Sequence, residues 1–209
     1  MATNRESSLT LERGLTLLQV VADAEAEAPS VSDLAVAIGI SRAAVYRLLV
    51  PLEDRGLIRR TGSRVRLGMG VLALAARVLP QLRAVATPTL RALAERVGAT
   101  AHLTVADGEE AQAVAVVEPS WTDYHVAYRV GSRHPLHRGA AGRAVLLREG
   151  WVATAGELEA GAHGVAAPVR GVAGLVASVG VVTLAPLDAD EVGPLVVEAA
   201  TALADLLTP

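Results

Sequence analysis

The first third of the chain alternates short amphipathic segments with breakers. Residues 10–24 carry four apolar side chains at helical spacing and predict an amphipathic helix. A capping-box pattern, Ser30 to Asp33, begins a second, short helix that ends at Gly39. The inward positions of the first helix are Leu11, Leu15, Leu18 and Ala22.

A third helix is predicted from Ser41 onwards, with Val45, Leu48, Leu49 and Leu52 as its inward stripe. Pro51 falls inside this helix and predicts either a kink or an end near Leu49 with a restart. A short helix, a turn containing glycine and a longer helix are typical of a helix-turn-helix. In such a unit the third helix lies in the major groove of DNA, where its first turns meet base edges.

The exposed face of the third helix carries candidate DNA contacts. An arginine guanidinium can bind O6 and N7 of guanine, and an alanine methyl group can contact the thymine methyl group. The alternative is a three-helix bundle that has nothing to do with DNA. The predicted contacts on this helix are Ser41, Arg42, Ala43, Tyr46 and Arg47.

A β-hairpin is predicted over residues 57–68, with its turn at residues 61–63. A hairpin fringed with arginine beside a helix-turn-helix is typical of a winged helix, whose wing contacts phosphates or enters the minor groove. The predicted wing contacts are Arg59, Arg60, Arg64 and Arg66.

The remainder of the chain predicts helices and an antiparallel sheet, an α+β arrangement. A strongly apolar helix covers residues 69–83 and bends or stops at Pro80, and a separate helix covers residues 87–97. From residue 99 the period changes to two. The strands expected there are 101–105, 110–117, 124–130, 165–170 and 174–184, and the helices are 140–147 and 188–207.

Composition narrows the class of protein. The chain has 209 residues and a net charge of −3, but residues 41–66 carry a local charge of +5, the footprint expected for a polyanion partner. Cysteine is absent, which excludes disulfides, thiol catalysis and cysteine-ligated metals.

We expect a cytoplasmic protein with no membrane partner, because no apolar run approaches a bilayer span. His134 and His137 have the spacing of a metal pair without a second cluster, so we expect no metal, cofactor or catalytic residue.

Several motifs together resemble the IclR family of bacterial transcriptional regulators. They are residues 10–15, residues 31–39 followed by SRAAVYRLL, residues 64–68, residues 129–137 running into Gly142-Arg143-Ala144, residues 157–161 and residues 165–169. The resemblance implies an N-terminal winged helix-turn-helix domain at 1–68, a linker helix at 69–86 and a C-terminal GAF-like antiparallel-sheet domain at 87–209 that binds an effector. It also implies a homodimer or a dimer of dimers, and control of operons by small carboxylate or aromatic molecules.

The chain departs from the family pattern in ways that change the expected effector site. The effector domain looks truncated, since helical sequence is missing between Leu147 and Arg148. Ala43 and Ala44 replace hydroxyl residues of the recognition helix. The resemblance places the effector positions at Ala140, Ala141, Trp151, Thr154, Gly164, Gly180 and Val182. Such small and apolar side chains fit an apolar or aromatic ligand, or a collapsed pocket without any ligand.

We therefore expect a transcriptional regulator, a repressor, that binds a palindromic double-stranded operator and responds allosterically to a small effector or acts without one. We expect it not to be an enzyme. The alternative is a GAF-like small-molecule-binding or enzymatic module whose N-terminal domain mediates protein contacts.

Overall fold

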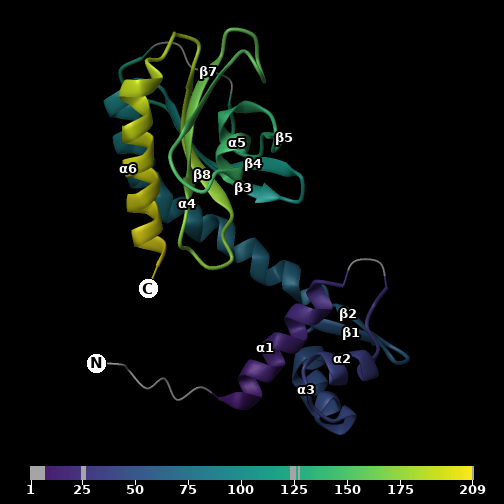
Figure 1. Cartoon of the computed structure of the whole chain (residues 1–209). Coiled ribbons are helices and arrows are strands. Elements are labelled where there is room, and N and C mark those ends of the chain that lie inside the picture. Colours follow the sequence, from purple (N-terminus) through teal and green to yellow (C-terminus); the bar gives the residue numbers. More distant parts are fainter. Residues whose placement is uncertain (1–7, 25–26, 123–125, 127, 209) are drawn as a thin grey trace. The chain divides into compact units, whose positions relative to one another are not determined.

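The computed structural model describes residues 8–24, 27–122, 126 and 128–208. It divides into two compact units, Met1–Val78 and Leu79–Pro209 (Figure 1).

The first unit is a winged helix. Its helices are α1 (Leu9–Ala22), α2 (Val31–Ala37) and α3 (Arg42–Asp54), and its wing is β1 (Ile58–Thr61) paired antiparallel with β2 (Arg64–Leu67). The core contains the fully buried side chains of Leu17, Leu34, Val45, Leu49, Ile58 and Val65. The predicted helix-turn-helix and hairpin are therefore both present.

Local signals fix the ends of these helices. The Ser30 hydroxyl accepts from the Asp33 amide at 3.2 Å, and the Asp33 carboxylate accepts from the Ser30 amide at 2.8 Å, so the predicted capping box forms. Gly39 has a φ of 66°, which suits glycine in the turn that follows α2. Helix α3 runs unbroken through Pro51, so the alternative of an end near Leu49 is wrong. Proline removes only its own amide hydrogen bond, and the buried stripe continues to hold the helix.

Helix α4 (Gly70–Val97) replaces the two helices expected at 69–83 and 87–97. Both Pro80 and Pro88 lie inside it, so the predicted stop was wrong. Packing explains the difference, because the second half of α4 is built into the core of the second unit and outweighs two lost amide hydrogen bonds. The buried side chains of α4 are Leu82, Ala86, Leu90, Leu93 and Ala94. By length and composition α4 could cross a membrane.

The second unit is built on a six-stranded antiparallel sheet in the order β5-β4-β3-β8-β7-β6. The strands are β3 (Thr100–Asp107), β4 (Glu110–Val117), β5 (Arg133–Pro135), β6 (Val152–Ala155), β7 (His163–Val169) and β8 (Ala177–Thr183). Helices α4 and α6 (Ala189–Leu207) cover one face, and α5 (Gly139–Leu146) covers the other (Figure 1). The α+β prediction is thus confirmed.

The strand expected at 124–130 is not observed as such. Val126, Tyr128 and Arg129 have no strand structure, and Tyr124, His125 and Ala127 lie outside the described residues. The edge strand is instead the short β5. Val126 and Tyr128 are lining residues of a pocket, so their period-two pattern reflects burial of one side of an irregular segment.

Trp151 offers a test of how α6 packs. Its indole ring lies against Gly193 of α6, where a Cβ would come within 2.3 Å of Cε2 and 2.4 Å of Nε1. We expect Gly193→Ala to destabilise the protein by about 1–3 kcal/mol, because the ring must move in a packed core. Differential scanning calorimetry gives the stability. Emission of Trp151, measured in a Trp121→Phe background, should change in wavelength. Unchanged emission and stability together would contradict this packing.

Candidate functional site

The recognition helix α3 presents four of the predicted contacts to solvent. Arg42, Ala43, Tyr46 and Arg47 are exposed, on the side opposite the buried Val45 and Leu49. The helix begins where the Ser41 hydroxyl accepts from the Ala44 amide at 3.2 Å. The hydroxyl of Ser41 therefore serves as a cap, and its predicted DNA contact remains a prediction.

The two arginines of α3 differ in their freedom. Arg42 Nη1 donates to the Ser32 hydroxyl at 3.3 Å, which links α3 to α2. The Arg47 guanidinium has no hydrogen bond or ion pair with any residue that the structure describes. Arg47 is therefore the guanidinium on this face that is free to fork onto a base edge.

The wing brings two unpaired arginines together. Arg59 of β1 and Arg66 of β2 are direct cross-strand partners, and both are exposed. Neither has an acidic partner among the described residues. Like charges directly opposite each other destabilise a hairpin. This local positive charge is well suited to a polyanion.

The other two wing arginines are bound to protein groups. Arg60 forms an ion pair with Glu53 of α3 at 2.5 Å, and its guanidinium lies 5.9 Å from the centre of the Tyr46 ring. The pKa of the Glu53 carboxyl is lowered, chiefly by the hydrogen bond from Arg60. Arg64 pairs with Glu27 and donates to the Ala28 carbonyl at 2.8 Å. Of the four predicted wing contacts, Arg60 and Arg64 therefore anchor the wing to other parts of the protein, whereas Arg59 and Arg66 remain unpaired.

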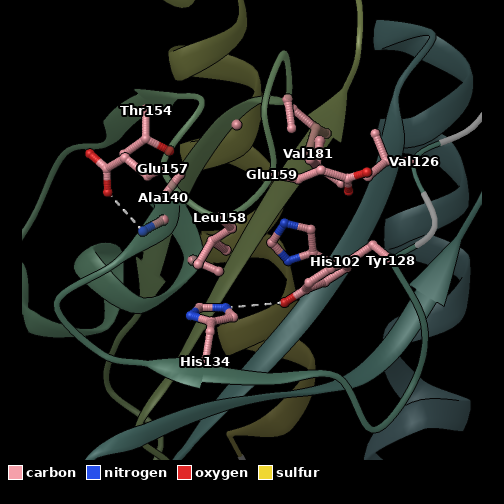
Figure 2. Close-up of a pocket in the computed structure, with 15 residues that line it drawn as sticks. His102, Val126, Tyr128, His134, Ala140, Thr154, Glu157, Leu158, Glu159 and Val181 are labelled. Carbon is pink, nitrogen blue, oxygen red and sulfur yellow. Dashed lines mark hydrogen bonds between the residues drawn. The ribbon is translucent and has the colours of Figure 1, made fainter.

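A pocket lies on the α5 face of the sheet in the second unit (Figure 2), with a cavity volume of about 70 Å³. The structure places five of the predicted effector positions in its lining: Ala140, Ala141, Thr154, Gly164 and Val182.

Two predicted effector positions lie elsewhere. Trp151 packs with the main core and Gly193 of α6, on the opposite face of the sheet. Gly180 lies beneath His102, where a Cβ would come within 2.7 Å of the imidazole Cε1. Glycine at 180 therefore makes room for the histidine ring and does not itself face the cavity.

The polar floor of the pocket consists of side chains that the sequence analysis did not assign. His102 Nδ1 lies 3.2 Å from the Thr104 hydroxyl, and the Tyr128 hydroxyl lies 3.4 Å from Nε2 of His134. Burial, with a further contribution from His134, lowers the pKa of His102 to about 3, so the ring is neutral at pH 7. The available signal was a histidine in a predicted strand with an apolar neighbour on each side, Ala101 and Leu103.

A strap, residues 156–162 between β6 and β7, covers one side of this pocket. The Glu157 carboxylate accepts from the Gly139 amide at 2.9 Å and pairs with Arg143 at 2.9 Å (Figure 2 shows the first contact). Leu158 packs on Gly139, where a Cβ would come within 2.5 Å of the leucine Cδ1. The Glu157 side chain therefore caps the N-terminus of α5.

The candidate metal pair consists of His134 and His137. His134 lies in β5 and faces Tyr128, and the described residues contain no group of three or more His, Asp or Glu side chains that could hold an ion.

Comparison with known proteins matches both units. The IclR helix-turn-helix domain model matches residues 10–62, and the bacterial transcriptional regulator IclR C-terminal model matches residues 76–149. The transcriptional repressor IclR of Escherichia coli K12 is 29% identical over 152 residues, which cover 70% of this chain and 54% of that protein. The acetate operon repressor of Salmonella typhimurium is 30% identical over 149 residues, covering 69% and 53%. The chain thus spans about half the length of these relatives.

Solved structures share the fold of this chain. A putative transcriptional regulator from Rhodococcus sp. RHA1 aligns with a TM-score of 0.53 and 26% identity, covering 96% of this chain and 98% of that chain. An IclR homolog from Microbacterium hydrocarbonoxydans, complexed with 4-hydroxybenzoate, aligns with a TM-score of 0.53 and 21% identity, covering 95% and 98%. Because both family models match in the order in which the winged helix and the pocket-bearing unit occur, the chain belongs to the IclR family of bacterial transcriptional regulators.

Proposed function

We propose that this protein is a sequence-specific DNA-binding regulator, a repressor, that reads an operator with α3 and holds the backbone with its wing. The observation that carries this proposal is the exposed pair Arg59 and Arg66, opposed across the hairpin and without an acidic partner in the described part of the chain. The free guanidinium of Arg47 on α3 supplies the base-reading group. The names of the curated relatives support a repressor.

The protein acts as a homodimer on a palindromic operator. Within the first unit, α1 and the start of α4 both expose large apolar side chains, and monomeric proteins rarely leave extensive apolar surface in water. A two-fold dimer would bury this surface and match a two-fold operator. Its exposed side chains are Leu9, Leu11, Leu15, Met69, Leu72, Leu74 and Val78.

A protein partner explains the apolar part of α4 better than a membrane, so the proposed location is the cytoplasm. The largely exposed residues 70–81 span only about 18 Å of helix. The hydrocarbon core of a bilayer is about 30 Å thick. Beyond residue 81 the buried side chains of α4 belong to the core of the second unit.

The pocket binds a small effector whose occupancy changes DNA affinity. A binding role fits better than a catalytic one, because the buried hydroxyl of Thr104 and the ring of His102 are bonded to each other.

The wing arginines provide the first test. Arg59→Ala and Arg66→Ala should each weaken binding to all DNA sequences and reduce the salt slope by roughly one unit per lost phosphate contact. Fluorescence anisotropy at several salt concentrations, with DNA from upstream of the gene, measures the slope. Arg64→Ala is the matched control, since its guanidinium is already bound to Glu27 and Ala28. Equal slopes for all three variants and the parent would rule out the wing as the phosphate contact.

The recognition helix provides the second test. Arg47→Ala should lose about 1–3 kcal/mol of binding to the operator and little to scrambled DNA, because a base contact carries the specificity. The ratio of the two dissociation constants measures this loss. A ratio equal to that of the parent would show that Arg47 does not read the operator.

A charged substitution in the exposed apolar surface tests the proposed dimer. Leu72→Glu places a carboxylate in the exposed apolar surface and should convert the dimer to a monomer in sedimentation equilibrium at micromolar concentration. Its operator affinity should fall because one half-site is lost. An Arg77→Glu control changes charge on the same helix. If the parent itself sediments as a monomer that binds the operator, the dimer proposal fails.

A further inference from the structure

We propose that the pocket of the second unit selects a small, positively charged amine and rejects carboxylates. This inference rests on the proposed effector role of the pocket and adds the chemical class of the ligand.

The positive end of the pocket is already filled by the chain itself. The guanidinium of Arg138 donates to the Glu157 carbonyl. The start of α5 and the guanidinium of Arg143 are the other groups at this end that would attract an anion. Both are engaged by the two carboxylate oxygens of Glu157, at 2.9 Å each. Arginine is absent from the described lining residues. A ligand carboxylate would therefore lose its hydration without gaining a cationic partner, which is unfavourable.

A second carboxylate at the pocket has no such partner. Glu159 is exposed and lines the pocket near Val126 and Val181 (Figure 2). No hydrogen bond or ion pair joins its carboxylate to another residue in the described ranges. Its negative charge favours a cation and adds to the penalty for an anion.

The floor offers an acceptor and aromatic faces to a cation. His102 is only 3% exposed, and Nδ1 is bonded to Thr104 while the described residues provide no partner for the other ring nitrogen. When Thr104 accepts from Nδ1–H, Nε2 becomes an acceptor for an ammonium donor. The Tyr128 ring, whose centroid lies 5.0 Å from that of His102, adds a cation–π surface.

The cavity sets the size of the ligand. An engineered apolar cavity of about 150 Å³ holds benzene. The volume of about 70 Å³ observed here therefore suits a molecule smaller than benzene. Propylamine, 1-propanol and propionate form a set of three-carbon probes whose polar head groups are positive, neutral and negative.

The experiment titrates the full-length protein with each probe and follows the His102 ring resonances by NMR at pH 7. Propylamine should shift these resonances with millimolar affinity, 1-propanol should bind more weakly, and propionate should not bind. Glu159→Gln should weaken propylamine by about two- to fivefold, as expected for a partly exposed ion pair, and leave 1-propanol unchanged. Glu149→Gln, which removes an equal charge from an exposed site outside the pocket lining, is the matched control.

Glu157→Gln provides a second variant with the opposite expectation. Freeing the α5 N-terminus and Arg143 should allow propionate to shift the His102 resonances, with a melting curve to confirm that the variant is folded. Propionate binding to the parent as tightly as propylamine, no binding of propylamine, or equal propylamine affinity in the parent and Glu159→Gln would each overturn the proposal. DNA binding by the parent, measured separately, tests the proposed regulator without reference to the amine.

Discussion

The pairing of β3 with β8 holds the second unit together. These two strands pair residues that lie between 72 (Val105 with Ala177) and 82 (Thr100 with Val182) positions apart in the sequence. They connect the β5-β4-β3 half of the sheet to the β8-β7-β6 half. Because side chains alternate across a strand, this register sends Leu103 and Val179 into the core under α4 and α6. It sends His102 and Ser178 to the α5 face, where the Ser178 hydroxyl donates to the Ala141 carbonyl at 2.8 Å. One register therefore sets both the core and the pocket.

The small residues on the α5 face of the sheet allow helix α5 to approach neighbouring backbone and side chains closely. A Cβ on Gly142 would lie 2.6 Å from the Leu136 carbonyl oxygen, and one on Gly164 would lie 3.3 Å from the Ala140 methyl group. Helix α5 can lie tightly on β7 only with such residues. Ala140 and Gly164 were expected to line either an apolar effector pocket or a collapsed one. The polar character of the pocket comes instead from β3, the segment near Tyr128 and the strap.

Local signals were enough to predict the winged helix, since a capping box, a turn glycine and a two-strand pattern each act over a few residues. They failed at Pro80 and Pro88, where packing of the second half of α4 outweighs the loss of two amide bonds. The division of the wing arginines also depends on distant acids. Arg60 finds Glu53 on α3, and Arg64 finds Glu27 before α2, contacts that composition and spacing do not reveal. The pocket floor combines His102, Tyr128 and His134 from separate segments. Sequence periodicity can predict which side of a strand is buried, but it cannot predict which side chains from other segments meet there.

Repulsion between Arg59 and Arg66 lowers the free energy of local opening of the wing when no polyanion is present. The strands of this hairpin are only four residues long, so few backbone hydrogen bonds oppose the repulsion. Amide protons of the free wing should therefore exchange with solvent faster than those of the buried α3. Phosphates that neutralise the pair would slow this exchange, and part of the binding free energy would then be spent on ordering the hairpin. If the wing contacts DNA as proposed, it reaches its most rigid state only on its target.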